Sequence, residues 1–467
     1  MAKDGREFKS RRAPIHEVAV TGDTLTSRAG LALFARYLHE TGVLARLEQG
    51  FSQVRGNRKA QPVGEIFKQL LCFLMDGSSR HLRYFDALQQ DAGYAATIES
   101  EPRRLLSSHG VKRFFKKLGG RGYYFGFRAL LQELWLWRLR VERPALVALG
   151  LDSMVMDNDE ATGREGVKPT YKQVKGFHPL QLTWGRYMVD ALFRGGSHHC
   201  NHGTTASTML RRAVATIRQY DPAVPIVVRM DAGFMDAALF ALCDELGIAF
   251  ICTGKMYPDI KAQAAQAPPD QWHRYANAHQ CWDYWEWQDR RGTWPRAWRA
   301  FYLRPYYEAQ QMVLEFARPE TVLYTNLGLG GTVDHQLRQA GLDEWLEPPR
   351  IIESSHDRGA DELVHRAFKD FGFEQLPCAH FAPNAALYYT MVTGFFLFEA
   401  FKHDVCQPVV PVTAYATTVR RQLLDVAGKI VRSSGRVTLK VTAAVWDRLK
   451  LAQLWQRSGT PPRLAVT

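Results

Sequence analysis

Cysteines are few in this sequence, and no two of them stand at the Cys-x-x-Cys spacing of a zinc ribbon or a redox centre. The seven cysteines are scattered along 467 residues and are odd in number. They give no disulfide framework, and we expect reduced thiols in a cytoplasm. Segment 197–203 contains the residue types of zinc sites but lacks a companion Cys or His pair, so we expect an ordinary loop there.

Long hydrophobic runs are also missing. Residues 1–12 are polar and basic, without the apolar stretch of a signal peptide. The most apolar segment, residues 385–398, is interrupted by Thr390, Thr393 and Gly394 and is too short to cross a bilayer. We therefore expect a buried core helix at this segment and no membrane partner.

Acidic residues are outnumbered, since 47 Asp and Glu stand against 60 Lys and Arg and give a net charge of +13. Clustered cations gain affinity for phosphates by releasing condensed counterions, so the excess indicates a nucleic acid partner. The excess is concentrated in residues 103–143 and again after residue 408. Our candidates for phosphate contact in the first cluster are Lys112, Arg113, Lys116 and Lys117.

Length and apolar spacing together predict several domains. A chain of this length, with 46% hydrophobic residues, can form roughly two to four folded units. Residues 1–143 are predicted to be helical, because apolar residues recur at helical spacing over 31–38, after a possible cap at Ser27, and again over 66–75. We interpret residues 1–143 as a helical DNA-binding region.

From residue 144 the pattern changes to strands separated by helices. The order β-β-β-α-β-α-β predicts an α/β fold with a mixed sheet and helices on its faces, and residues 144–255 form its first part. The predicted strands cover 145–155, 179–184, 187–193, 226–230 and 248–252, and the predicted helices cover 204–220 and 236–246.

Residues 256–322 interrupt this pattern with six tryptophans, and we interpret them as an inserted β-rich subdomain. Trp282, Trp285 and Trp287 alternate as on a strand, which places two or three of them on one face, mostly as core. The αβ pattern resumes in residues 323–407, the second part of the core, and residues 408–467 form a basic C-terminal segment.

Two aspartates occupy chemically informative positions on predicted strands. Asp152 lies inside an apolar strand, where an unpaired charge is costly. Asp231 follows the strand at 226–230. Carboxylates at such positions on neighbouring strands point into one crevice, where oxygen ligands hold hard cations. Either aspartate alone could equally serve as a turn or a cap.

A third acid, Glu362, lies on the predicted helix 358–371. At 100° per residue, Arg358, Glu362 and Lys369 fall within about 40° of one another. Leu363, Ala367 and Phe371 lie towards another side and can pack. This stripe fits an intrahelical ion pair worth ~0.3–0.5 kcal/mol. It also fits an acid that binds metal between cations that hold phosphate oxygens.

These segments resemble the DDE transposases of bacterial insertion sequences. One subclass carries its last acid in a Tyr-x2-Arg-x3-Glu-x6-Lys signature, which Arg358, Glu362 and Lys369 match at the same spacing. Ser355 stands at the tyrosine position, with His356 beside it. Around the second acid, Arg229-Met-Asp231-Ala-Gly-Phe234 is similar to the family's Arg-x-Asp-Ser-Gly-Phe.

The segment of the first acid also resembles the family. Leu151-Asp152, followed by Gly176-Phe-His-Pro-Leu180, is similar to the family's first-acid strand and its His-Pro-Leu continuation. Family members often have a second aspartate and a threonine after this acid, where this chain has Met154 and Val155. Asp152 is the best choice, with Asp157 and Asp159 as alternatives. The stretch from Asp76 to Arg83 resembles the family as well, and the likeness extends over about residues 25–440.

The resemblance implies a ribonuclease-H-like catalytic core. Asp152, Asp231 and Glu362 would be the catalytic acids and would bind two Mg²⁺ or Mn²⁺ ions ~3.5–4 Å apart. Arg358 and Lys369 would neutralise charge on the DNA backbone. In related transposases the insertion handles the transposon end, so one of its three tryptophans could stack on an extruded base.

The expected function is transposition of an insertion sequence, with binding of its terminal inverted repeats, DNA cleavage and strand transfer. The expected partners are double-stranded DNA, as transposon end and as target, and a second copy of the chain in a homodimer. The expected location is a bacterial cytoplasm, at the nucleoid. A hydrolytic DNA nuclease, or a catalytically silent DNA-binding protein derived from a transposase, would share the same features.

Overall fold

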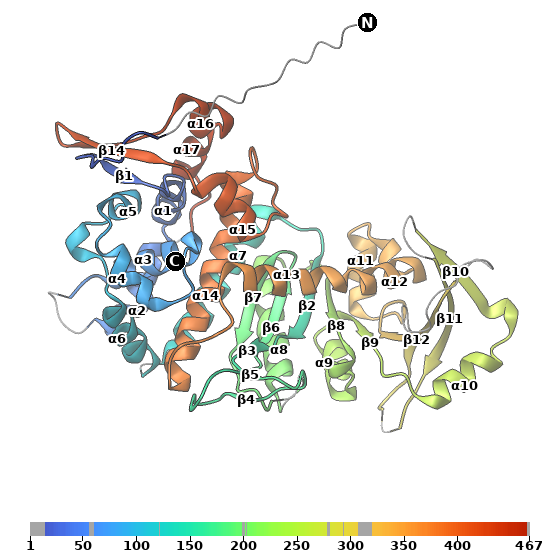
Figure 1. Cartoon of the computed structure of the whole chain (residues 1–467). Helices are drawn as coiled ribbons and strands as arrows, with labels where there is room; N and C mark the ends of the chain where they lie inside the picture. Colours follow the sequence, from blue (N-terminus) through green and yellow to red (C-terminus); the bar gives the residue numbers. More distant parts are fainter. Residues whose placement is uncertain are drawn as a thin grey trace, which may run out of the picture.

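The computed structural model describes residues 15–55, 60–120, 122–198, 201, 203–277, 281–292, 294–306 and 320–464. Within these residues the chain has a mixed α/β fold built around a nine-stranded sheet, in the order β10-β11-β12-β13-β9-β8-β2-β6-β7. Figure 1 shows the sheet running from the centre of an elongated molecule to one end, with a helical region at the other end.

Five of these strands follow the predicted β-β-β-α-β-α-β order. The central strand β2 pairs antiparallel with β6 on one side and parallel with β8 on the other. Strand β7 continues from β6, and β9 continues parallel from β8. The five strands are β2 (Val147–Ser153), β6 (Leu180–Trp184), β7 (Tyr187–Leu192), β8 (Ile226–Met230) and β9 (Ala249–Thr253).

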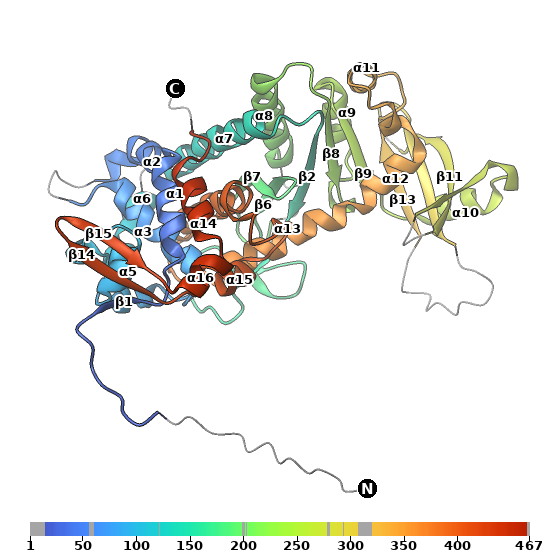
Figure 2. The same ribbon diagram turned by 90° about the horizontal axis from the view of Figure 1, so that it is seen from above.

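Helices cover both faces of this part of the sheet, which is why β6 and β8 are buried along their whole length. Helices α8 (Thr205–Tyr220) and α9 (Ala237–Glu245) lie on one face. Helix α13 (Arg358–Phe371) crosses the other face, as Figure 2 shows. Both predicted helices of the first core part and the predicted helix at 358–371 are thereby confirmed.

The Trp-rich segment is rich in strands, and these strands extend the same sheet beyond β9. All of its pairings are antiparallel. The strands are β10 (Trp272–Ala276), β11 (Cys281–Asp289), β12 (Trp298–Pro305) and β13 (Thr321–Thr325). The helices at this end are α10 (Pro258–Gln266), α11 (Thr332–Gln339) and α12 (Pro348–His356).

The N-terminal region is helical, as predicted, and packs around α14 (Phe381–Phe401). Every residue of α14 from Pro383 onward is buried, which confirms the predicted core helix. Among the described residues, no helix is long and apolar enough to cross a membrane. The N-terminal helices are α1 (Leu31–Glu40), α2 (Val43–Phe51), α3 (Val63–Asp76), α4 (Phe85–Leu88), α5 (Ala92–Thr97), α6 (Ser108–Gly119) and α7 (Tyr123–Glu142).

One strand of the N-terminal region and two strands of the C-terminal segment form a small three-stranded sheet, ordered β1-β14-β15. Its strands are β1 (Thr24–Thr26), β14 (Gly428–Ser433) and β15 (Arg436–Lys440). The predicted cap at Ser27 is wrong, because α1 begins after Gly30. A side chain at Gly30 would collide with the backbone of Leu423, so the close approach of the C-terminal segment requires glycine at this position.

Shorter elements complete the fold. A second small sheet, ordered β3-β5-β4, lies in the segment between β2 and β6. Its strands are β3 (Met156–Asp157), β4 (Lys168–Pro169) and β5 (Lys175–Phe177). The remaining C-terminal helices are α15 (Ala416–Val419), α16 (Ala443–Arg448) and α17 (Leu451–Gly459), and π-helical turns span Lys402–Cys406 and Arg420–Leu424.

Candidate active site

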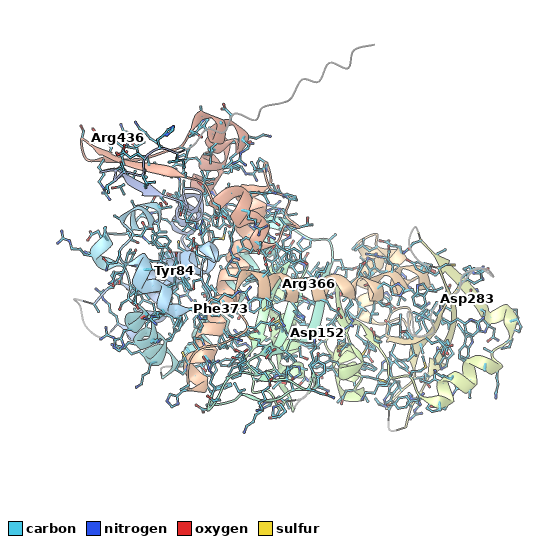
Figure 3. All side chains as sticks on the ribbon, viewed as in Figure 1. Tyr84, Asp152, Asp283, Arg366, Phe373 and Arg436 are labelled. Carbon is cyan, nitrogen blue, oxygen red and sulfur yellow. The ribbon has the colours of Figure 1, made fainter. Side chains whose placement is uncertain are left out.

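Asp152 and Asp231 lie side by side because of the strand register. Leu151 on β2 pairs with Met230 on β8 in the parallel ladder, and each aspartate is the next residue along the chain. The Asp152 Oδ1 accepts a hydrogen bond from the N–H of Ser153 at 2.7 Å. The Asp231 Oδ1 accepts one from the N–H of Gly233 at 2.9 Å. Hydrogen bonds from nearby backbone N–H groups thus hold both carboxylates at one edge of the sheet. The position of Asp152 is labelled in Figure 3.

The Asp152 carboxyl is short of positive charge. Burial raises its pKa to about 7, and repulsion by Asp231 is the next largest cause. Glu362 adds a smaller repulsion, while the Ser153 N–H and Arg358 act in the opposite direction. A buried carboxyl with this pKa, beside a second carboxylate, is stabilised by any cation that binds between them.

Helix α13 brings Glu362 and Arg358 to the same edge. The Arg358 guanidinium lies 3.2 Å from Glu362 Oε1 and 4.0 Å from Asp231 Oδ2. Arg358 therefore bridges the second and third predicted acids. The Glu362 side chain is 61% exposed, so it is free to reorient when Arg358 finds another partner.

Lys369, the other cation of the predicted stripe, is engaged elsewhere. Its Nζ lies 2.9 Å from Glu374 Oε1. Of the three residues predicted to pack, Phe371 is buried and Ala367 packs against the core. The prediction is wrong for Leu363, because this side chain is 51% exposed. The buried positions of α13 include Val364 and Phe368, together with a charged residue that the sequence did not mark.

That residue is Asp361, which anchors α13 to the sheet. Its Oδ1 lies 2.9 Å from the Arg229 guanidinium, and both side chains are nearly buried. Arg229 is the register partner of Gly150, and a Cβ at Gly150 would lie 2.6 Å from the Asp361 Cγ. The absence of a side chain at Gly150 lets the helix approach the strand next to Asp152. Burial raises the pKa of Asp361 to about 6, although Arg229 and Arg358 lower it.

His365 is a second residue that the sequence reasoning missed. Its Nδ1 lies 3.9 Å from Asp152 Oδ2. Burial lowers the pKa of His365 to about 4, and the charges of Lys369 and Arg358 act in the same direction. The imidazole is therefore neutral at pH 7. The signal in the sequence that could have identified His365 is its position three residues after Glu362 on the same helix.

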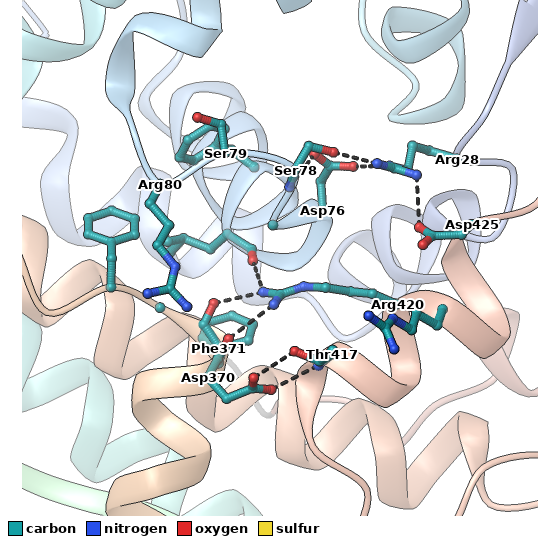
Figure 4. Close-up of a pocket in the computed structure, with 16 residues that line it drawn as sticks. Arg28, Asp76, Ser78, Ser79, Arg80, Asp370, Phe371, Thr417, Arg420 and Asp425 are labelled. Carbon is teal, nitrogen blue, oxygen red and sulfur yellow. Dashed lines mark hydrogen bonds and ion pairs between the residues drawn. The ribbon is translucent and has the colours of Figure 1, made fainter.

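The far end of α13 is tied to the N-terminal helices by Arg420, as Figure 4 shows. Its guanidinium donates to backbone carbonyls at the ends of two helices, Leu74 and Met75 of α3 and Asp370 and Phe371 of α13. A cation suits both helix C-termini because their free carbonyls carry partial negative charge.

The first part of the stretch from Asp76 to Arg83 belongs to this junction: residues 76–80 line a cavity of about 230 Å³ together with Arg420. Gly77 ends α3 with a φ of 62°, and a side chain there would collide with the Arg420 guanidinium. Asp76 accepts a hydrogen bond from Arg28 at 2.5 Å. Hydrogen bonding and close packing at the junction thus account for this motif.

Asp157 and Asp159, the two alternatives for the first catalytic acid, stabilise a turn. Asp157 is exposed, and its Oδ1 accepts a hydrogen bond from the N–H of Asp159 at 2.9 Å. Asp159 in turn accepts one from the N–H of Lys175 at 3.0 Å. In this arrangement both carboxylates serve the hairpin that follows β2.

Other predicted residues are placed as follows. The Ser355 Oγ donates to the carbonyl of Ile352 at 2.7 Å, within its own helix. The ring of His356 packs 5.2 Å from that of Trp282. Trp285 and Trp287 stack at 4.4 Å on the opposite face of β11. In segment 197–203, His199, Cys200 and His202 lie outside the described residues.

Helix α6 presents its basic residues to solvent. Its opposite side packs into the core through Val111, Phe114, Phe115 and Leu118. The exposed basic residues are the four predicted ones, Lys112, Arg113, Lys116 and Lys117.

The donor set at this edge suits a hard divalent cation. Asp152 and Asp231 supply carboxylate oxygens, the ligands that Mg²⁺ and Mn²⁺ prefer, and Asp152 is destabilised as an anion. Glu362 is turned to Arg358, and in the described part of the chain no three His, Cys, Asp or Glu side chains converge closely enough to hold a metal ion. The chemistry of the two sheet carboxylates therefore fits a cation, and Glu362 lies beside them in an ion pair with Arg358.

Comparison with known proteins identifies the family. No curated protein matches the chain. A solved structure, the cryo-EM structure of a piggyBac transposase synaptic complex with hairpin DNA, is similar at 11% identity and a TM-score of 0.34, over 84% of this chain and 79% of that one. The sequence profile of the family described as transposase DDE domain group 1 matches residues 9–458. Because this match spans nearly the whole sequence, the chain belongs to the transposase DDE domain group 1 family.

Proposed function

We propose that the chain cuts DNA at the ends of an insertion sequence and joins those ends to target DNA, with Asp152, Asp231 and Glu362 as its catalytic acids. The observation that carries the proposal is the pairing of Asp152 and Asp231 at the ends of adjacent parallel strands, with Glu362 on a helix anchored beside them. The family membership supports the DNA transposase activity itself.

The strand topology supports a ribonuclease-H-like core. Its five strands have the order β7-β6-β2-β8-β9, with an antiparallel half and a parallel half that meet at β2. We propose residues 144–255 and 323–407 as the two parts of this core, residues 256–322 as the insertion, and residues 1–143 as a DNA-binding region. The Arg358, Glu362 and Lys369 spacing favours the Tyr-Arg-Glu-Lys subclass of insertion sequences, with Ser355 at the first position.

DDE transposases generally use divalent metal ions. Bound by the three acids, two Mg²⁺ or Mn²⁺ ions would activate the attacking oxygen and stabilise the leaving oxygen during displacement at phosphorus. Asp152 and Asp231 are the residues that would hold a cation from the sheet, and Glu362 would hold one from α13. Arg358 is the cation that can pass from Glu362 to a DNA phosphate, because a bidentate guanidinium suits phosphate as well as carboxylate.

The neighbouring residues keep this edge of the sheet in shape. Neutral, buried His365 fills the space beside Asp152 and limits its exposure to water. Lys369 is held by Glu374 and becomes available to the DNA backbone only when that ion pair opens. Contact with double-stranded DNA along α6, and a homodimer on paired ends, complete the proposal.

A strand-transfer assay tests the function directly. The purified chain is incubated with Mg²⁺, a supercoiled target plasmid, and linear DNA that carries the inverted repeats flanking its gene. We expect joined products, and pre-cleaved ends with a free 3′-hydroxyl should be joined as well. Cleavage of uncut ends without any joining of pre-cleaved ends would instead assign the chain as a hydrolytic nuclease.

Cation binding is expected to depend on pH through Asp152. Its pKa is raised from 3.8 to about 7, so below pH 7 a cation must displace a proton from this carboxyl. Affinity should therefore rise about tenfold per pH unit up to about pH 7 and then level off. The sign for stability is the reverse: the cation-free protein loses stability as pH rises from about 4 to about 7, because folding disfavours the charged form.

Calorimetric titration of the purified chain with Mn²⁺ at a series of pH values measures this slope. Asp152→Asn removes a ligand together with the titrating group, so Mn²⁺ should bind more weakly and without this pH dependence. Asp159→Asn, in the nearby turn, should preserve both the affinity and its pH dependence. An affinity that does not change with pH in the wild-type protein would show that Asp152 is not a ligand.

A further inference from the structure

The small sheet β1-β14-β15 has one face packed against the protein and one face exposed to solvent. On the packed face, Ile430 and Thr26 are each 6% exposed, and the Thr26 Oγ1 accepts a hydrogen bond from the Thr97 hydroxyl of α5 at 3.1 Å. On the other face Leu25 is 53% exposed, and its register partner Lys429 points the same way. The outer face is therefore available to a partner.

Strands β14 and β15 carry an electrostatic conflict on this outer face. Lys429 pairs directly with Lys440 in the register, and like charges at opposed positions destabilise a sheet. Asp23 neutralises Lys429, with its carboxylate 2.9 Å from the Nζ. Lys440 and Arg436, on the same face, have no carboxylate partner among the described residues. The surface thus lacks negative charge that a partner could supply.

The outer half of this hairpin is exposed on both faces. Arg432 and Val437 are register partners near the tip of the hairpin. They lie on the face that is packed at the base of the hairpin, but near the tip both side chains are exposed. Ser434 and Gly435 form the turn with φ angles of 49° and 74°. Figure 3 shows Arg436 at the periphery of the helical region, far from Asp152. The β14–β15 hairpin is therefore a two-stranded ribbon with basic residues on both faces.

We propose that the β14–β15 ribbon, residues 428–440, binds double-stranded DNA in the major groove, as a contact separate from the acidic site. A B-DNA major groove is about 12 Å wide and admits a two-stranded ribbon. The phosphates along the groove are contacted by Lys429, Arg436 and Lys440, which share one face of the ribbon, and Arg432 enters the groove at the tip. This inference rests on the proposed function only in taking DNA as the partner; it deepens that proposal by assigning a surface to the basic C-terminal segment.

Salt dependence of binding by the full-length chain tests the ribbon. The variant Arg436→Gln/Lys440→Gln removes two phosphate contacts, so the slope of log affinity against log salt should fall by about two. Affinity for a duplex should be roughly tenfold to a hundredfold weaker at ~0.1 M salt. The variant should unfold at the temperature of the wild type or above it, because it relieves the opposition of Lys429 and Lys440.

A charge-matched control places the same change elsewhere on the molecule. Arg211→Gln/Arg338→Gln removes two exposed cations from α8 and α11 and should leave the salt slope unchanged. The proposal is overturned if the ribbon variant keeps the wild-type salt slope, or if the salt slope of the control falls as much as that of the ribbon variant. It is also overturned if the wild-type chain fails to bind duplex DNA. If the ribbon variant loses as much affinity for an RNA duplex as for a DNA duplex, the assignment to the major groove is overturned. A wild-type chain that binds DNA but joins no ends would refute the proposed function and leave the ribbon intact.

Discussion

Glu362→Gln is expected to slow DNA cleavage roughly 10³-fold or more while DNA binding stays within about twofold of wild type. A cation held by three carboxylates supplies several kcal/mol of charge stabilisation in the transition state, and ~4 kcal/mol corresponds to three powers of ten in rate. The amide keeps the size of the side chain and removes its charge. Glu362 is 61% exposed, so folding should tolerate the change. Single-turnover cleavage of a labelled transposon end and fluorescence anisotropy measure the two quantities.

The control is Glu353→Gln, which removes a half-exposed acid from α12 that pairs with Arg350. Its cleavage rate should stay near that of the wild type. Asp152→Asn and Asp157→Asn form a second matched pair and separate the candidates for the first acid. Equal activity of wild type and Glu362→Gln would remove this residue from the site, and cleavage by neither would favour the catalytically silent descendant.

Asp361→Asn is expected to cost ~3–5 kcal/mol of folding stability, because it leaves the buried charge of Arg229 without its partner. Helix α13 should loosen from the sheet, and cleavage should fall because Glu362 is the next residue. Thermal unfolding followed by circular dichroism measures the loss. Gly150→Ala is an independent way to displace the helix, since its new Cβ would lie 2.6 Å from Asp361 and from Thr183.

A double variant separates the fold from the position of the helix. Arg229→Met/Asp361→Leu replaces both charges with apolar side chains, which often restores the stability that is lost when one partner is removed. We expect the double variant to be more stable than Asp361→Asn. A double variant no more stable than Asp361→Asn would mean that the ion pair itself, and not the unpaired charge, determines stability at this position.

Local sequence predicted the elements that carry the site. The strand at 226–230 was predicted with the bounds that the structure gives, and so was the helix at 358–371. Both have strong local signals, β-branched residues before Asp231 in one case and a helical apolar spacing in the other. The adjacency of Asp152 and Asp231 followed from the strand order, because parallel neighbours end at the same edge.

Contacts between distant segments could not be predicted in this way. Asp361 has the sequence environment of a surface helix acid, and only its partner on β8 makes it a buried anchor. Leu363 was expected to pack, yet the helix turns that side to solvent because Asp361 and Phe368 face the sheet and α14. Lys369 was expected on the stripe with Glu362, but Glu374, beyond the end of the helix, binds it instead.

The first strand of the chain has a kinetic consequence. Residues 24–26 pair with residues 428–430, so they remain without their partner until that later segment has left the ribosome. At ~5–20 residues per second, that wait lasts roughly 20–80 s. During it the N-terminal helices expose apolar surface that the C-terminal residues later cover, which favours chaperone binding and exchange of ends between two nascent copies. A shortened product that ends before residue 428 would keep the basic face of α6 but could not form the sheet β1-β14-β15.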